Sequence, residues 1–225
     1  MFHYRKGSSP VLNCSRIEQI TKPRAERFLR VHEHFGNVGL GVWHWGLFIG
    51  RQLAAVVSYG TVCFSTRRGW LASLSTQVGY PIIQLCRGGS AKRAPVGAAS
   101  RLVCGANRAM SRLKGPVFVV AYADPKLGEV GTIYQACNAV YTGFTRPKGQ
   151  AQYVIFGRRM SAWEVRKRFG TRDRSKLREL DPVCTILTLE PKHRYVMVAG
   201  HPLARRNMVR QLQAYRLPYP KRHDA

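Results

Sequence analysis

Apolar residues along the chain fall into short runs separated by glycine, proline and polar residues, as expected for strands and helices packed around a core. Two of the longest runs, 40–49 and 53–59, are joined by Gly50, Arg51 and Gln52 and predict a hairpin. Further strands are expected at 11–17, 80–86, 117–122, 140–144 and 153–156.

Helical spacing of apolar residues marks two longer segments. The first begins near Pro23, with Thr21 as a candidate N-cap, and ends at residues 32–36. The second follows Gly97, and a shorter helix is expected at 131–138. In the second helix the apolar face comprises Ala99, Leu102, Val103, Ala106, Met110 and Leu113, and another face carries Arg101, Arg108 and Arg112.

This order of elements predicts an α+β fold, with a mixed, mostly antiparallel sheet flanked by helices. It resembles the GNAT-like fold of acyltransferases. The resemblance implies that the loop at 87–97 and the helix N-terminus after it hold the pyrophosphate of an acyl-CoA on backbone N–H groups. The loop is basic and contains Gly88 and Gly89, but it departs from the glycine pattern usual in that fold.

The composition changes at residue 157, which predicts a GNAT-like catalytic domain over 1–157 and a basic extension over 158–225. The extension includes strand candidates at 183–189 and 194–198. A solvated helix face normally mixes both charge signs, so we interpret the extension as a DNA-contacting attachment packed on the same domain. Its most basic run is Arg166, Lys167 and Arg168, which lies between Trp163 and Phe169.

The chain of 225 residues carries 37 Lys and Arg against 11 Asp and Glu, a formal charge of +26. Self-repulsion of this size favours a polyanionic partner, and nucleic acid is the natural one. We expect no membrane partner and a location in the cytoplasm of a bacterial host, because no apolar run is long enough to span a bilayer and no apolar signal core begins the chain. Six cysteines without Cys-x-x-Cys spacing are expected to be reduced core thiols.

The acidic residues are distributed unevenly. Between Glu33 and Asp124 there is no Asp or Glu, although Arg and Lys are frequent, so this stretch is a candidate phosphate-facing surface. Asp124 directly follows an apolar run expected to be a buried strand, which places a carboxylate where chemistry is often found. The alternative is that Asp124 opens a turn with Pro125, and the sequence alone leaves the two open.

The segment Tyr122-Ala123-Asp124-Pro125, with its continuation over 128–143, resembles the Mom family of phage DNA-adenine modification proteins. Supporting matches are found at 84–87, 98–100 and 34–36. The resemblance implies an enzyme that transfers a methylcarbamoyl-type group to the exocyclic amine of adenine in duplex DNA and so protects phage DNA from host restriction. It places functional residues at His34, Arg87, Ser100, Asp124 and Tyr134, and Phe35 stands where the family motif has tyrosine.

The adenine amine is a poor nucleophile, so the enzyme must orient it, take its proton and activate the electrophile. In this interpretation Asp124 accepts the proton, while Arg87, Gly88, Gly89 and Ser100 hold the small-molecule donor, acyl-CoA or a related activated compound. The target base is expected to flip out and stack on an aromatic ring. The candidate rings are Tyr134, Tyr122, Trp43 and Trp45.

Other interpretations of these residues stay open. His34, Asp124 and Tyr134 together could bind iron, whereas His34 could equally be a helix-end histidine and Tyr134 a buried aromatic. Rival functions are a GNAT-type acyltransferase acting on a protein or small-molecule amine, and a non-catalytic nucleic-acid-binding protein. A homodimer is compatible with the sequence.

Overall fold

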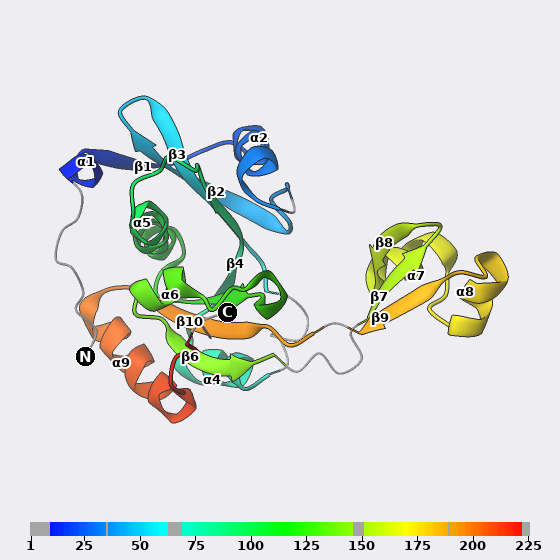
Figure 1. Cartoon of the computed structure of the whole chain (residues 1–225). Coiled ribbons are helices and arrows are strands. Elements are labelled where there is room, and N and C mark those ends of the chain that lie inside the picture. The colour runs from blue at the N-terminus through cyan, green and yellow to red at the C-terminus, as the bar shows by residue number, and fades with distance from the viewer. Residues whose placement is uncertain (1–9, 35, 63–68, 146–150, 189, 222–225) are drawn as a thin grey trace. The chain divides into compact units, whose positions relative to one another are not determined.

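The structure is a computed structural model that describes residues 10–34, 36–62, 69–145, 151–188 and 190–221. It contains two compact units (Figure 1). Unit 1 comprises residues 1–143 and 193–225, and unit 2 comprises residues 144–192. Among the described residues, no helix is both long and apolar enough to cross a membrane.

Unit 1 is built on a seven-stranded sheet of order β1-β2-β3-β4-β5-β10-β6. β4 and β5 pair in parallel, whereas β1–β2, β2–β3, β3–β4 and β5–β10 are antiparallel pairs, which confirms the expected α+β fold with a mostly antiparallel sheet. The strands are β1 (Ser15–Gln19), β2 (Gly41–Ile49), β3 (Gln52–Gly60), β4 (Ile82–Ser90), β5 (Val117–Ala123), β6 (Val140–Phe144) and β10 (His193–Ala199).

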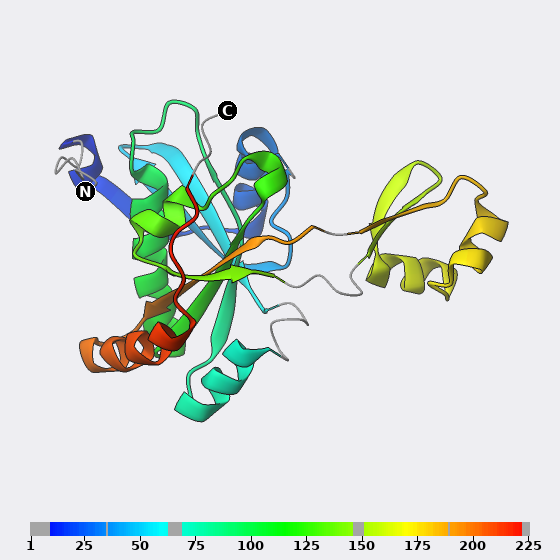
Figure 2. The ribbon, with the colours of Figure 1, turned by 60° about the horizontal axis from the view of Figure 1, so that its bottom comes forward.

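Helices cover both faces of this sheet (Figure 2). In β5, Val119 and Ala121 belong to the core formed with α5, whereas Phe118 and Val120 belong to the core formed with α4 and α9. This alternation explains why β5 forms a continuous apolar run in the sequence. The helices of unit 1 are α1 (Pro10–Asn13), α2 (Lys22–His32), α4 (Trp70–Val78), α5 (Ala98–Lys114), α6 (Thr132–Ala136) and α9 (Pro202–Leu212), with 3₁₀ turns η1 (Pro125–Leu127) and η2 (Gln213–Tyr215).

Unit 2 has its own three-stranded antiparallel sheet of order β8-β7-β9 and its own core. Tyr153, Ile155 and Met160 pack there against Val165 of α7 and Leu177 of α8. The two ends of the unit are joined, since Thr145 N donates to Lys192 O at 2.8 Å and Lys192 N donates to Thr145 Oγ1 at 2.9 Å. Its elements are β7 (Ala151–Ile155), β8 (Arg158–Ser161), α7 (Ala162–Phe169), α8 (Arg174–Leu180) and β9 (Thr185–Thr188).

The compact units do not divide the chain at residue 157 as the composition suggested. β10, expected within a C-terminal extension, lies inside the main sheet, where Val196 pairs with Val120 of β5. The strand expected at 153–156 belongs instead to unit 2. The change in composition at residue 157 reflects surface charge. The sheet to which β7 or β10 belongs depends instead on strand pairing between residues far apart in the chain.

Three local expectations also differ from the structure. The opening segment at 11–17 is a short helix followed by β1, and α4 was not expected at all. Residues 87–90 form the end of β4 and not part of a loop. Their glycines suggested a loop, but Gly88 and Gly89 pair with Val57 and Val56 of β3.

Candidate active site

The parallel strands β4 and β5 diverge part-way along the sheet. They pair at only three positions, ending with Gln84 opposite Val120. Beyond that point β4 continues along β3 as far as Ser90 opposite Ala55, and β5 continues along β10. The divergence opens the middle of the sheet on the side of α5.

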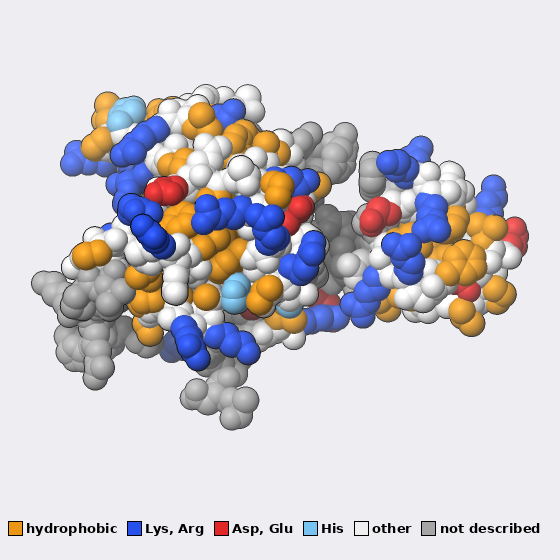
Figure 3. All heavy atoms as spheres, turned by 90° about the horizontal axis from the view of Figure 1, so that it is seen from above, with side chains coloured by type: hydrophobic (Ala, Val, Ile, Leu, Met, Phe, Trp, Pro, Cys, Tyr) orange, Lys and Arg blue, Asp and Glu red, His pale blue; other side chains and the backbone are white. Residues whose placement is uncertain are grey.

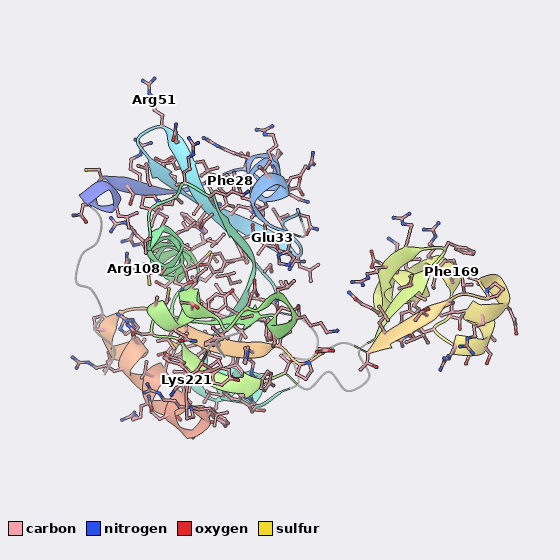
Figure 4. All side chains as sticks on the ribbon, viewed as in Figure 1. Phe28, Glu33, Arg51, Arg108, Phe169 and Lys221 are labelled. Carbon is pink, nitrogen blue, oxygen red and sulfur yellow. The ribbon has the colours of Figure 1, made fainter. Side chains whose placement is uncertain are left out.

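A cavity of about 480 Å³ occupies this opening. Its wall is formed by the end of α2 with residues 32–34, the strand end 88–90, the first turns of α5, and the segment 127–134. Glu33 projects from the end of α2, as Figure 4 shows. The volume lies within the range of small-molecule and cofactor sites.

Glu33 supplies a largely buried carboxylate to this cavity, with its side chain 8% exposed. Its Oε2 atom accepts a hydrogen bond from Gly36 N at 3.0 Å, and its Oε1 atom lies 3.7 Å from His34 Nδ1. His34 lines the cavity as expected, with its side chain 46% exposed. Glu33 was not expected at the site, and its position as the last acid before the stretch without Asp or Glu was the available sequence signal.

Asp124 lies directly after β5 as expected, but its carboxylate caps a turn. Oδ1 accepts a hydrogen bond from Lys126 N at 3.1 Å at the start of η1, and Asp124 N donates to Glu129 Oε2 at 2.9 Å. Glu129 and Ala123 line the cavity, whereas Asp124 borders it. Asp124 therefore opens a turn, which was one of the two alternatives. Its backbone N–H also holds the carboxylate of Glu129, which lines the cavity.

Tyr134 lines the cavity from α6. Burial raises the pKa of Tyr134, and the negative charge of Glu129 raises it further, so the phenol keeps its proton at neutral pH. Its ring centroid lies 5.4 Å from that of Tyr195. Tyr134 is thus suited to donate a hydrogen bond.

Of the four residues expected to hold a donor, two line the cavity and two do not. Gly88 and Gly89 line the cavity, and a Cβ at Gly89 would lie 3.1 Å from His32 O, so a side chain there would crowd the end of α2. Arg87 and Ser100 do not belong to the lining. Arg87 Nη1 donates to Cys86 O at 2.8 Å, and Ser100 Oγ donates to Gly97 O at 3.1 Å at the start of α5.

Two of the three residues expected to bind iron lie on the cavity wall and one does not. His34 and Tyr134 line the cavity, whereas Asp124 caps η1 outside the lining. In the part of the chain that the structure describes, no group of three or more His, Cys, Asp and Glu residues could hold a metal ion.

The expected stacking residues other than Tyr134 lie elsewhere. Trp43 and Trp45 pack against the core on the α5 side, and Tyr122 packs against the core on the α4 and α9 side. Lys114 Nζ lies over the ring of Trp43, 4.7 Å from the ring centroid. Phe35 lies outside the described residues, as does the side chain of Trp163.

A model of the Mom protein family matches residues 15–221. The chain belongs to this family. The match extends through both compact units, so unit 2 is part of what this chain shares with the Mom family. Comparison with curated protein sequences gave no significant match.

Solved structures that the Mom-family chain resembles include several acetyltransferase-type proteins. A Bacillus subtilis acetyltransferase in complex with CoA is 10% identical with a TM-score of 0.41, and the match covers 81% of this chain and 97% of that one. Arabidopsis thaliana NAA60 in complex with acetyl-CoA is 11% identical with a TM-score of 0.45, covering 82% and 98%. A Drosophila melanogaster polyamine N-acetyltransferase is 11% identical with a TM-score of 0.41, covering 81% and 99%.

The basic residues expected to contact DNA occupy two places in this Mom-family chain. On α5, Arg101 is half-buried and its Nε donates to Ser15 Oγ at 2.7 Å, whereas Arg108 and Arg112 are exposed. In unit 2, the three basic residues 166–168 are all exposed on α7. Figure 3 shows Lys and Arg side chains spread over each unit, with few Asp and Glu on that face.

Proposed function

We propose that this chain transfers a methylcarbamoyl-type group to the exocyclic amine of adenine in duplex DNA, and that in phage this protects the DNA from host restriction. The observation that carries the proposal is the cavity between β4 and β5, whose lining includes the largely buried carboxylate of Glu33 and the protonated phenol of Tyr134, in a chain of charge +26. Membership of the Mom family supports it.

The chemistry requires a proton acceptor close to the amine. Glu33 lines the cavity, and a carboxylate there can take one proton from the adenine amine as the N–C bond forms and the bond from the carbonyl carbon to the leaving group breaks. Asp124 is the second candidate, because it borders the same cavity and matches the family motif. Tyr134 can donate a hydrogen bond to the oxygen on which negative charge develops.

An activated acyl donor such as acyl-CoA would supply the electrophilic carbonyl. Gly88, Gly89 and the first turn of α5 line the cavity, and the backbone N–H groups of a helix start favour an anionic group. We therefore assign the donor's anionic part to the start of α5 and the adenine amine to the space that Glu33 and Tyr134 line. Ser100, one residue beyond the lining residue Ala99, would act on the donor's anionic part. Arg87 would act indirectly, by donating a hydrogen bond to Cys86 O and so supporting the end of β4 that lines the cavity.

Duplex DNA is the substrate that suits the charge of the protein. The exposed Arg108 and Arg112 on α5 and the basic run 166–168 on α7 can neutralise phosphates without reading sequence. The amine is then reached by flipping the adenine out of the duplex. A GNAT-type acyltransferase of another amine would use the same cavity but has no need of these cations, and a non-catalytic DNA-binding protein would have no need of the buried Glu33.

Mass analysis of nucleosides tests the proposal. DNA from cells expressing the wild-type chain should contain deoxyadenosine of increased mass, and Glu33→Gln should reduce its amount by about a hundredfold, the lower range for a positioned base. Glu26→Gln is the matched control, because Glu26 is on the same helix but outside the cavity lining. Unmodified DNA from cells with soluble wild-type protein would overturn the proposed function.

A further inference from the structure

The hairpin of unit 2 ends in an unusual turn. Ile155 of β7 pairs with Arg158 of β8, so Phe156 and Gly157 form a two-residue loop, and their φ angles are 50° and 70°. Positive φ at both loop positions favours Asn followed by Gly, because a large side chain at the first position is strained. Phe156 is therefore a residue that turn chemistry alone would not select.

The rest of unit 2 imposes this conformation. Asp181 is 3% exposed, and its Oδ2 atom accepts a hydrogen bond from Phe156 N at 2.6 Å. Its Oδ1 atom accepts from Val183 N at 3.2 Å. A buried carboxylate thus fixes the backbone of the tip.

The ring of Phe156 contributes little to the core. The side chain is 60% exposed and does not belong to the buried cluster of unit 2. Phe169 at the end of α7 is an aromatic neighbour, with ring centroids 6.4 Å apart. Phe169, labelled in Figure 4, carries the guanidinium of Arg168 at 5.7 Å from its ring. An exposed aromatic therefore stands beside the basic end of α7.

The charge around this tip suits a polyanion. Residues 144–192 contain twelve Lys and Arg against five Asp and Glu. Two of those acids have structural tasks, since Asp181 holds the turn and Asp173 caps α8 by accepting from Ser175 N and Lys176 N. Arg158 and Arg159 directly follow the tip and are exposed.

We propose that Phe156 is a wedge that inserts at a base step of duplex DNA, while the cations of β8 and α7 hold the flanking phosphates. Apolar side chains placed between base steps unstack them and bend the duplex. This inference rests on the proposed function in one respect: unstacking near the target lowers the cost of flipping the adenine. It assigns unit 2 a task beyond electrostatic attraction.

Phe156→Asn distinguishes an effect on DNA binding from an effect on folding. Asn-Gly is the preferred pair for this turn, so the variant should unfold at an equal or higher temperature than wild type. Its affinity for duplex DNA should nevertheless fall about tenfold, the effect of losing one base stack. Leu180→Asn is the matched control, since Leu180 is another exposed apolar residue of the same unit, with 51% of its surface exposed, and its DNA affinity should match wild type.

A second measurement reports the wedge directly. 2-Aminopurine in a duplex should brighten on binding full-length wild-type protein and Phe156→Leu, which keeps an apolar wedge, and should stay quenched with Phe156→Asn. Wild-type affinity together with wild-type brightening in Phe156→Asn would overturn the inference, as would an equal loss of binding to single-stranded RNA. Nucleoside mass analysis keeps the two proposals apart, because the wedge stands if unstacking depends on Phe156 in a protein that leaves adenine unmodified.

Discussion

The ring of Tyr195 lies where a side chain on Gly131 would have to be. A Cβ built on Gly131 would fall 2.3 Å from Tyr195 Cε2, and Gly131 has a φ of 67°. Tyr195 also donates from its hydroxyl to Val130 O at 2.6 Å. The segment that carries Glu129 and Tyr134 to the cavity is thus fixed against β10.

Gly131→Ala should therefore destabilise unit 1 and displace Tyr134. The positive φ costs about 1 kcal/mol, and the clash adds roughly 1–3 kcal/mol. Gly128→Ala is a matched control, because Gly128 has a φ of 68° and nothing within 4 Å of its built Cβ. Urea unfolding should show a clearly larger loss for Gly131→Ala, and equal losses would show that the contact with Tyr195 gives way easily.

Asp124→Asn tests the family-matched carboxylate. The amide oxygen can still accept from Lys126 N, so the turn and the fold should survive. Loss of the charge should lower modified adenine by about a hundredfold, and DNA affinity should stay the same or rise because one negative charge has left a basic surface. Asp173→Asn alters the same kind of cap in unit 2 and should leave modification unchanged. Full modification with folded Asp124→Asn would remove Asp124 from the site.

Replacing the basic run of α7 should weaken binding to every DNA sequence. The triple change Arg166→Gln, Lys167→Gln and Arg168→Gln should also reduce the slope of log affinity against log salt, by about 0.9 for each phosphate that the protein no longer neutralises. Arg205→Gln with Arg206→Gln removes two exposed charges from α9 and controls for loss of charge alone, so the slope should change less per charge removed than in the α7 variant. An unchanged slope in the α7 variant would mean that this run is an ordinary solvated face.

Cys104 should react with alkylating reagents at lower pH than an ordinary thiol. A hydrogen bond with Cys137 lowers the pKa of Cys104 to about 7, and the charges of Arg108 and Arg205 contribute. The same contact raises the pKa of Cys137. The thiolate of Cys104 accumulates as pH rises through 7, so the alkylation rate followed by mass spectrometry should increase over that range.

Cys137→Ala removes the hydrogen bond and should move the alkylation profile of Cys104 to higher pH. Cys104→Ser should abolish the component that titrates near 7. A profile for Cys104 that is the same with and without Cys137 would contradict the contact. The expectation that all cysteines are core thiols is wrong for Cys14, which is exposed, whereas Cys104 and Cys137 are partly buried and Cys137 packs against the main core.

Much of the main sheet was predictable because its signals are local. The β2–β3 hairpin, α5 and β5 follow from turn residues, helical spacing and an apolar run that both faces bury. The position of β10 between β5 and β6 could not be predicted, because the residues of a strand do not indicate which other strands it pairs with. α4 was missed because Ser and Thr interrupt its short apolar face of Leu71 and Leu74.

The site was predictable in part for the same reason. His34, Gly88, Gly89 and Tyr134 meet at the cavity as the motifs implied. Glu33 was missed, because nothing in the neighbouring sequence indicates whether a single acid at a helix end is buried or exposed. Arg87 was misplaced because its neighbouring glycines indicate a loop, whereas in a strand successive side chains point to opposite faces.

The position of β10 between β5 and β6 has a consequence for synthesis on the ribosome. Both neighbours leave the ribosome before unit 2, yet the strand that joins them follows it in the chain. Until residues 193–199 emerge, β5 lacks this neighbour, and the buried Tyr195 that braces Gly131 has not arrived. The cavity wall is therefore completed late, and a nascent chain stalled within unit 2 should expose an apolar strand edge that chaperones recognise.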